Sequence, residues 1–452
     1  MSKRSGIILV LYSSRGLAQL PLRVAVSDHL FCWGRYSKHD VIYRNVAFGF
    51  SWDEFRDLPI RAVVLHTILL ATRWDIEVFW QLVTPLFALR DFSGPKIAIP
   101  QDEFIQSEAL VTLFNRIRIT HILTAAPVAE ARRIYDGLAT EAEFRTVLTG
   151  YLDEVTLRQI RRLRRSVPDR DIDVGYRAWN AEAWLGEHGR LKVLVAHRVA
   201  EAAARHPGLR TDVSVDEKST LLGADWLRFM LRCRTMLGVE GGASVLDRDG
   251  SIARRTRAFV AANPDASFED IREACFAEEE GSLDLRAIGP RHLEACATET
   301  CQVLVEGDYQ GILKPHEHYI PIRKDFSNLD EVLRQVADRD LTAAIAGRAR
   351  RDVVESGRYT YRRFVREIED EIIAPEGAPE GASAPTRASR FAVRFAQLRH
   401  SVSWVFAQFE AKHLLRNREY RYGTPEEIGW RWRTIRSLVR SLGTIIRIDT
   451  RI

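Results

Sequence analysis

Residues 288–330 read IGPRHLEACATETCQVLVEGDYQGILKPHEHYIPIRKDFSNLD, and they carry the clearest structural signal in the chain. The pattern predicts helix, strand, loop, strand and helix in turn. Residues 302–305 form a short apolar run that is typical of a buried parallel strand. A second strand is expected at residues 318–322, followed by a helix that Ser327 or Asn328 would cap.

The N-terminal third of the chain repeats this alternation. Short apolar runs occur at residues 7–12, 41–43, 63–66, 96–100 and 121–124, and amphipathic stretches such as residues 76–89 separate them. Strands that alternate with helices predict a parallel, doubly wound sheet. In such sheets, ligands bind beyond the carboxyl ends of the strands.

Polar residues follow two of these predicted strands and are candidates for catalysis. His66 ends the run at residues 63–66, and Asp102 and Glu103 follow the run at residues 96–100. Each of the three could act as a general base toward a hydroxyl group. The alternative for the two acidic residues is that they cap a helix, because a helix N-terminus carries partial positive charge.

The stretch at 288–330 resembles the C-terminal part of bacterial nucleotide-sugar-dependent glycosyltransferases of the GT-B type (the glycosyltransferase group 1-like domain). The matching segments are RHLEA at 291–295, YIP at 319–321 and KDFSN at 324–328, joined by a strand and a glycine loop. The resemblance covers roughly residues 60–370. It implies an α/β fold of two Rossmann-like domains that face each other across a cleft. A basic helical C-terminal extension beyond the resemblance is expected from composition and charge.

Composition and charge then suggest the domain boundaries. We expect an acceptor-side Rossmann-like domain at residues 1–165 and a nucleotide-sugar-binding Rossmann-like domain at residues 166–374. Residues 375–389 (PEGAPEGASAPTRAS) are predicted to be a flexible linker, because they are rich in Pro, Gly, Ala and Ser. Residues 390–452 are predicted to be a helical tail in which aromatic residues are interleaved with arginines.

The resemblance implies a donor site in the second domain. Arg177 and Lys192 match the arginine and lysine that face the donor diphosphate in such enzymes, although their spacing is longer than usual. Glu240 and Gly241 lie in a glycine-rich turn where the polar residues of the donor site would fall. The alternative is that Arg177 and Lys192 are two of 66 basic residues on a solvated surface.

The same resemblance assigns Arg291, His292 and Glu294 to the donor. Glu294 would accept hydrogen bonds from the ribose hydroxyls, while Arg291 and His292 would meet the phosphates. Alternatively, Glu294 only caps its own helix. Retaining members commonly carry two glutamates separated by seven residues, but Arg286 stands eight positions before Glu294. The stereochemical outcome is therefore left open.

No bound cofactor or metal is expected; the nucleoside-diphosphate sugar is a substrate. The segment His316-Glu317-His318 is a weak metal candidate, because on a strand Glu317 would point away from both histidines. The five cysteines show no framework of paired spacings and are expected to be reduced core thiols.

The overall composition is that of an ordinary globular protein, with 46% hydrophobic and 28% charged residues. No apolar run is long enough to predict a membrane span, so a cytoplasmic location is expected. From residue 387 to the end, 14 Lys and Arg stand against 5 Asp and Glu. The tail is thus an ordinary subdomain or a basic surface for anionic lipid at the inner membrane face; nucleic acid is not an expected partner.

These observations predict transfer of a sugar from a nucleoside-diphosphate sugar to a hydroxyl acceptor, with a lipid-linked or surface glycan as the candidate acceptor. Two other functions remain open. A nucleotide-sugar epimerase would share the architecture and need no acceptor. A catalytically degenerate binding or scaffold protein would agree with the missing glutamate pair.

Overall fold

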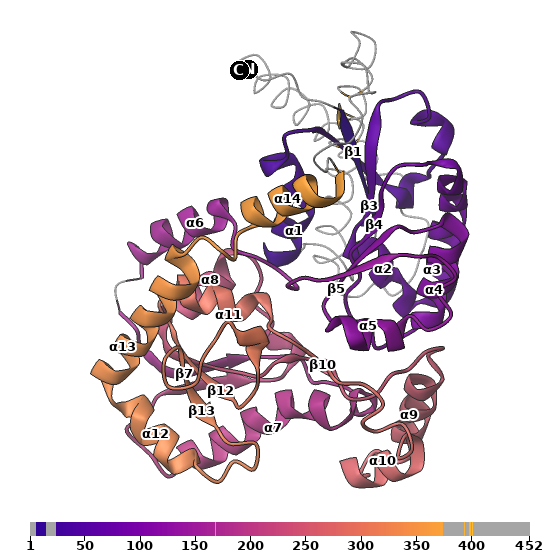
Figure 1. The fold of residues 1–452 in the computed structure, drawn as a ribbon. Helices are drawn as coiled ribbons and strands as arrows, with labels where there is room; N and C mark the ends of the chain where they lie inside the picture. The colour runs from indigo at the N-terminus through magenta and orange to yellow at the C-terminus, as the bar shows by residue number, and fades with distance from the viewer. Residues whose placement is uncertain are drawn as a thin grey trace, which may run out of the picture.

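The computed structural model describes residues 6–14, 24–167 and 169–373, together with residues 393, 397, 398 and 400 (Figure 1). Two α/β domains make up these residues, and each is built on its own sheet. The predicted linker at 375–389 lies outside the described residues. So does the predicted tail, apart from residues 393, 397, 398 and 400. Among the helices of the described part, none is both long and apolar enough to cross a bilayer.

The first domain contains a six-stranded parallel sheet with the order β2-β1-β3-β4-β5-β6. Its central strands are apolar on both faces, because helices cover both sides of a doubly wound sheet. The predicted apolar runs are all found in this sheet. The strands are β1 (Ile7–Tyr12), β2 (Asp40–Asn45), β3 (Ile60–Leu65), β4 (Lys96–Ala98), β5 (His121–Thr124) and β6 (Glu143–Thr146).

Alternate residues of β1 pack into two separate cores. Leu9 and Leu11 contribute to the core under the helices α3 (Ile76–Val83), α4 (Ser107–Ile117) and α5 (Val128–Ile134). Val10 lies in the core under α1 (Val24–Tyr36) on the other face. Successive side chains of a strand point to opposite faces, so one short apolar run supplies both cores.

The second domain contains a five-stranded parallel sheet with the order β13-β12-β9-β7-β8. Helices again cover both faces. The strands are β7 (Ile172–Arg177), β8 (Thr211–Ser214), β9 (Cys233–Gly238), β12 (Cys301–Val305) and β13 (Tyr319–Ile322). One face packs under α7 (Gly186–Ala203), α12 (Leu329–Ala337) and α13 (Arg339–Ala349), and the other packs under α6 (Glu154–Arg164), α8 (Ala224–Arg232) and α11 (Pro290–Ala297).

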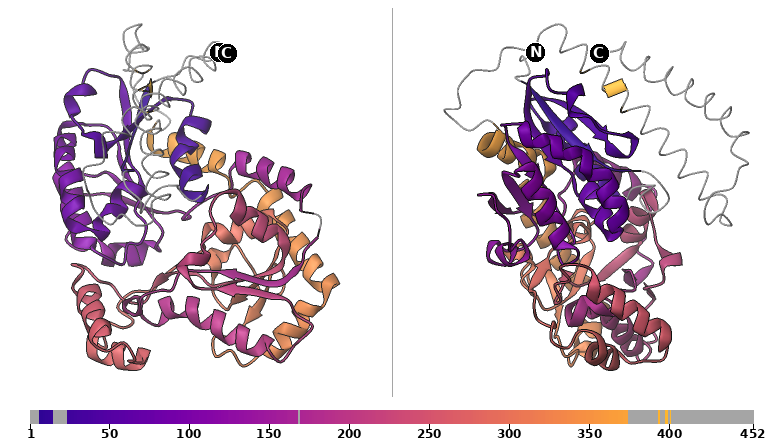
Figure 2. Two further views of the ribbon diagram at one scale, coloured as in Figure 1. Left: turned by 180° about the vertical axis from the view of Figure 1, so that it is seen from behind. Right: turned by 90° about the vertical axis from the view of Figure 1, so that its right-hand side faces the viewer.

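An insertion leaves the second domain between β9 and α11 and packs on the first domain. We define it as residues 241–287, which comprise β10 (Gly241–Ala243), α9 (Ser251–Ala262), α10 (Phe268–Cys275) and β11 (Leu285–Ala287). Figures 1 and 2 show its two helices below the first domain, at the end of an extended two-stranded connection. Ile252, Ile271 and Phe276 share one apolar core with α3 and α4, so the insertion joins the two domains.

The helix α14 (Tyr361–Ile368), near the end of the described residues, returns to the first domain. It packs against α1, and Tyr361 and Phe364 lie in the core on that face of the sheet (Figure 1). Main-chain hydrogen bonds of 2.9 and 3.0 Å tie Leu152 to Tyr359 and Tyr361. The sequence places residues 166–374 in the second domain, but the end of that range packs on the first. The predicted fold of two Rossmann-like α/β domains is confirmed.

Candidate functional site

The two domains meet at the N-terminus of α11. Pro290 occupies its first turn, where the missing N–H costs nothing. The hydroxyl of Thr149 in the first domain donates a 2.9 Å hydrogen bond to the carbonyl of Ile288. A Cβ on Gly150 would come within 2.8 Å of Pro290, so the chain needs glycine where the domains touch. α11 therefore begins at the domain junction and presents its first turns to it.

Glu294 lies on α11 with 8% of its surface exposed. Its Oε2 accepts a 2.8 Å hydrogen bond from the indole N–H of Trp226 on α8. In the part of the chain that the structure describes, no hydrogen bond to its other oxygen is found. Burial raises the pKa of this carboxyl, while Trp226 and Arg291 oppose that rise. Gly289 is the N-cap of α11, so the carboxylate of Glu294 faces another element instead of capping its own helix.

Arg291 stands one turn before Glu294. Its guanidinium donates a 2.9 Å hydrogen bond to the carbonyl of Arg177 and lies 5.9 Å from the ring of Trp226. No carboxylate of the described residues is within ion-pair distance of Arg291. The planar donor group therefore retains free N–H groups, which suit a phosphate.

Lys192 lies on α7. Its ammonium group forms no ion pair and no hydrogen bond with any described residue. Burial lowers its pKa, Arg291 adds to that effect, and Asp102 of the first domain opposes it. Asp102 and Arg291 are thus each close enough to influence the charge of Lys192. We call Asp102, Lys192, Arg291 and Glu294 the interdomain site.

Asp102 and Glu103 are neighbours in sequence, yet they face different surroundings. Asp102 is exposed and has a left-handed backbone, with φ of 52°. Glu103 is fully buried and accepts hydrogen bonds from Thr124 (2.7 Å), Tyr135 (2.8 Å) and the amide of Ala125 (2.9 Å). Burial raises the pKa of Glu103, which these donors oppose. Of the two, only Asp102 is exposed and close enough to Lys192 of the second domain to affect its pKa.

His66 lies inside the first domain. Its Nδ1 accepts from the amide of Ile68, at 3.2 Å, at the start of the short helix α2 (Thr67–Leu70). Its Nε2 lies 2.7 Å from Nδ1 of His29, and its surface is 0% exposed. Burial lowers the pKa of His66 well below its ordinary value. The neutral ring terminates β3 and does not reach the interdomain site.

Arg177 points along the edge of the sheet. Its guanidinium pairs with the carboxylate of Asp212 at 2.7 Å and lies 4.4 Å from the ring of Phe229. The guanidinium of Arg177 therefore contacts residues of β8 and α8. The contribution of Arg177 to the interdomain site is the carbonyl that accepts from Arg291.

The other predicted donor residues, Glu240, Gly241 and His292, have local structural partners. Glu240 accepts a 2.7 Å hydrogen bond from the amide of Tyr309 and so holds the loop after β12. Gly241 begins β10. His292 is buried; its Nδ1 bonds Gly289, while no partner of its Nε2 is found among the described residues. Burial lowers the pKa of His292 to about 3, so the ring is neutral.

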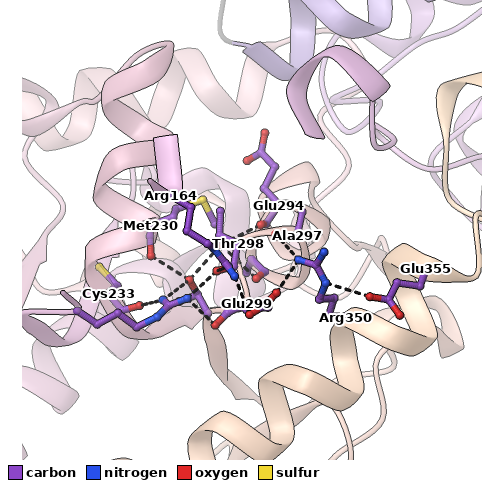
Figure 3. A network of polar contacts seen from close by, with 12 residues as sticks. Arg164, Met230, Cys233, Glu294, Ala297, Thr298, Glu299, Arg350 and Glu355 are labelled. Atoms are coloured by element: carbon purple, nitrogen blue, oxygen red, sulfur yellow. Dashed lines mark hydrogen bonds and ion pairs between the residues drawn. The ribbon is translucent and has the colours of Figure 1, made fainter. Parts of the chain in front are cut away.

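A polar network holds the far end of α11 (Figure 3). Glu299 pairs with Arg164 at 2.7 Å and with Arg350 at 2.6 Å, and Arg170 donates to the carbonyls of Thr298 and Glu299 at 2.6 and 2.8 Å. Cations are favourable at a helix C-terminus, where carbonyl groups lack partners. Figure 3 shows the carboxylate of Glu294 pointing away from this network. The helix that carries Arg291 and Glu294 is thus anchored behind the site.

The sequence interpretation missed Trp226, the partner of Glu294, and the aromatic contacts that cross the domain junction. Trp184 of the second domain lies 5.8 Å from Trp74 and 5.9 Å from Phe104. A tryptophan on an amphipathic helix reads as core, so no local signal marked Trp226 as a donor to a site residue.

Within the described residues, no group of three or more His, Cys, Asp or Glu side chains is placed to hold a metal. In the segment His316-Glu317-His318, the Nε2 of His318 lies 2.9 Å from Asp352, and His316 has a positive φ of 64°. All five cysteines are buried and unpaired.

No protein-family model matches the chain, and no curated protein matches it by sequence. Similar solved structures include HepE from Anabaena in complex with UDP and glucose (12% identity, TM-score 0.44, covering 82% of this chain and all of that one). They also include the BGT protein of phage T4 in complex with its UDP-glucose substrate (10% identity, TM-score 0.41, 81% and 99% covered). A third is sucrose-phosphate synthase from Thermosynechococcus elongatus (10% identity, TM-score 0.40, 80% and 97% covered). At identities of 10–12% these similarities bear on no residue of the site.

Proposed function

We propose that the protein is a glycosyltransferase that moves a sugar from a nucleoside-diphosphate sugar to a hydroxyl acceptor. One observation supports this above the others. Lys192 and Arg291 are two cations without a carboxylate partner among the described residues. Arg291 lies near the buried carboxylate of Glu294, and Lys192 lies near Arg291 and near Asp102 of the other domain.

The two cations suit the donor diphosphate. The ammonium of Lys192 and the guanidinium of Arg291 would neutralise phosphate charge, and the N-terminus of α11 adds partial positive charge nearby. As the bond between the sugar and the diphosphate breaks, negative charge grows on the leaving nucleotide, which fixed cations stabilise. In this proposal, these groups carry the electrostatic role, and the reaction requires no metal ion.

Glu294 suits the ribose of the donor. A carboxylate oxygen accepts hydrogen bonds from hydroxyl groups, and one oxygen of Glu294 has no donor in the described structure. The indole N–H of Trp226 fixes the orientation of the carboxylate, so the free oxygen is held in a constant position. The donor would therefore be read by α11 and α7 together.

Asp102 suits the acceptor. In an inverting reaction, Asp102 accepts the proton of the acceptor hydroxyl while that oxygen bonds to the anomeric carbon, and the nucleoside diphosphate departs with the electrons of the broken bond. His66 and Glu103, which the sequence also suggests as bases, are enclosed in the first domain. A lipid-linked or surface glycan remains the proposed class of acceptor.

Thermal unfolding with a panel of uridine, guanosine, cytidine and thymidine diphosphates and their sugars tests this function. A ligand at a hundredfold excess over its dissociation constant stabilises the native state by about 2.7 kcal/mol. We expect one nucleotide to raise Tm. The Lys192→Ala variant should bind that nucleotide roughly tenfold to a hundredfold more weakly, because a charge-assisted hydrogen bond is removed. Glu294→Gln should weaken binding as well.

Lys314→Ala is the matched control, because Lys314 is exposed and lies beyond the opposite ends of the strands. It should leave nucleotide affinity unchanged. If none of the nucleotides raises Tm, the proposal fails and a degenerate scaffold is favoured. If a bound nucleotide sugar is interconverted with its epimer, and neither water nor any other acceptor receives the sugar, the protein is a nucleotide-sugar epimerase.

A further inference from the structure

The loop that carries Asp102 has an unfavourable backbone. Asp102 and Gln106 have φ of 52° and 54°, in the left-handed region that residues other than glycine rarely adopt. Two such residues within residues 102–106 cost conformational energy that the surrounding structure must offset. Strain of this kind accumulates at functional sites, where a side chain must be held in one direction.

A buried arginine holds this loop from the first domain. Arg73 is 0% exposed, and its guanidinium donates to the carbonyls of Ile105 (2.9 Å), Leu70 (2.8 Å) and Gln101 (2.7 Å), and also to that of Asp102. No carboxylate of the described chain forms an ion pair with it. A buried charge is costly unless it is hydrogen-bonded, and here main-chain carbonyls supply most of that compensation. Three of the four belong to the loop.

The insertion holds the same loop from the second domain. The amide of Asp247 donates to the carbonyl of Phe104, and the amide of Gln106 donates to the carbonyl of Asp247, both at 2.7 Å. Ile105 and Asp247 thereby form a short parallel bridge. The carboxylate of Asp247 is buried and accepts from the amides of Ile252 and Ala253, at 3.2 and 2.8 Å, which ties the bridge to α9.

We propose that Arg73 and the bridge at Asp247 are positioning elements that hold Asp102 toward Lys192 of the second domain. The inference rests on the proposed function and adds that the acceptor side of the site is assembled by both domains. Released from either hold, the loop would relax toward ordinary backbone conformations, and the carboxylate would turn away from the second domain.

Asp102→Gly and Asp102→Asn test whether the left-handed backbone at residue 102 exists to position the carboxylate. Glycine adopts positive φ without cost, and asparagine tolerates it while it lacks a basic carboxylate. Both variants should bind the nucleotide found in the panel as the wild type does and lose most hydrolysis of its sugar. Their Tm should be unchanged or, for glycine, raised by roughly 2–4 °C.

Arg118→Gly is the control, because Arg118 is exposed and has φ of 54° at the C-cap of α4, away from the loop. It should tolerate glycine equally well and retain full hydrolysis. A fall of several degrees in the Tm of both Asp102 variants would assign a structural role to the carboxylate, and retained hydrolysis would remove its functional role. Either result overturns the proposal.

Arg73→Lys tests the hold itself, because lysine keeps the charge but lacks the planar fork of donors. We expect faster amide hydrogen exchange at Gln106 and slower hydrolysis, with nucleotide affinity unchanged. Arg116→Lys, on the exposed face of α4, should change neither. Unchanged exchange in a folded Arg73→Lys variant contradicts the proposal. If the wild type binds no nucleotide, the proposed function fails, while exchange and Tm still decide whether the loop is strained and held.

Discussion

The indole N–H of Trp226 meets one oxygen of Glu294 at 2.8 Å, and this hydrogen bond links α8 to α11 across the floor of the interdomain site. The carboxylate is buried on one side and has an unused oxygen on the other. Such an arrangement gives Glu294 a fixed direction before any ligand arrives, so less ordering is needed when a hydroxyl group binds.

Trp226→Phe should weaken nucleotide binding by roughly threefold to tenfold and lower the free energy of unfolding by about 1–2 kcal/mol. The change removes the donor while it keeps an aromatic ring beside Arg291, and a buried acceptor is left without a partner. Calorimetric titration and urea unfolding measure the two effects. Trp80→Phe, on α3 and remote from the site, should leave nucleotide affinity unchanged.

Acidification should destabilise the fold through the buried pair His29 and His66. Burial lowers the pKa of His29 to about 4 and that of His66 well below 6.5. The unfolded chain binds a proton on each ring as pH falls through 6.5, whereas the folded chain does so only near pH 4 or below. The stabilisation is complete above pH 6.5 and is lost progressively as pH falls toward 4, by an amount on the order of a few kcal/mol.

Urea unfolding across this pH range measures that slope. His29→Gln removes one of the two rings and should flatten the pH dependence, while His197→Gln, at an exposed position of α7, should reproduce the wild-type slope. A His29→Gln variant with the full slope would show that other groups cause the acid sensitivity.

Glu299→Gln should lower the free energy of unfolding by about 1 kcal/mol, because Glu299 pairs with both Arg164 and Arg350 in a partly solvated network. The difference from wild type should shrink at high salt, since exposed charges are screened. Glu355→Gln, which removes a single outer partner of Arg350, should cost less. An equal loss in both variants at all salt concentrations would contradict a network centred on Glu299.

Removal of residues 401–452 should reduce binding to vesicles that contain phosphatidylglycerol. The tail is rich in basic residues, and each basic residue near an anionic surface contributes about 1 kcal/mol at low salt. Co-sedimentation measures the effect, with neutral phosphatidylcholine vesicles as the control. Equal binding by the full and the shortened chain would contradict the anionic-lipid surface that the charge of the tail suggests.

Much of the fold could be predicted because its signals are local. The run at residues 7–12 coincides with β1, and the runs at residues 302–305 and 318–322 coincide with β12 and β13. Buried parallel strands are apolar on both faces, so they stand out in a sequence without any knowledge of their neighbours. The return of α14 to the first domain left no such signal, because its apolar stripe fits any core.

The site was harder to predict, because the direction of a side chain after a strand end depends on tertiary packing. Asp102 and Glu103 are adjacent, but the left-handed backbone at Asp102 sends one outward and leaves the other among Thr124 and Tyr135. Arg177 is predicted to face the donor, and its guanidinium pairs with Asp212 of the neighbouring strand while its carbonyl accepts from Arg291. Neither outcome follows from spacing along the chain.

The insertion and α14 also determine how the molecule can deform. One joins the domains beside α4 and the other beside α1, so the two bodies are fastened at both ends and not only by the chain between them (Figure 2). With two attachments, the easiest relative motion of the domains is a small shear of packed helices rather than a rotation about a hinge. The radius of gyration from X-ray scattering should therefore change little when nucleotide is added.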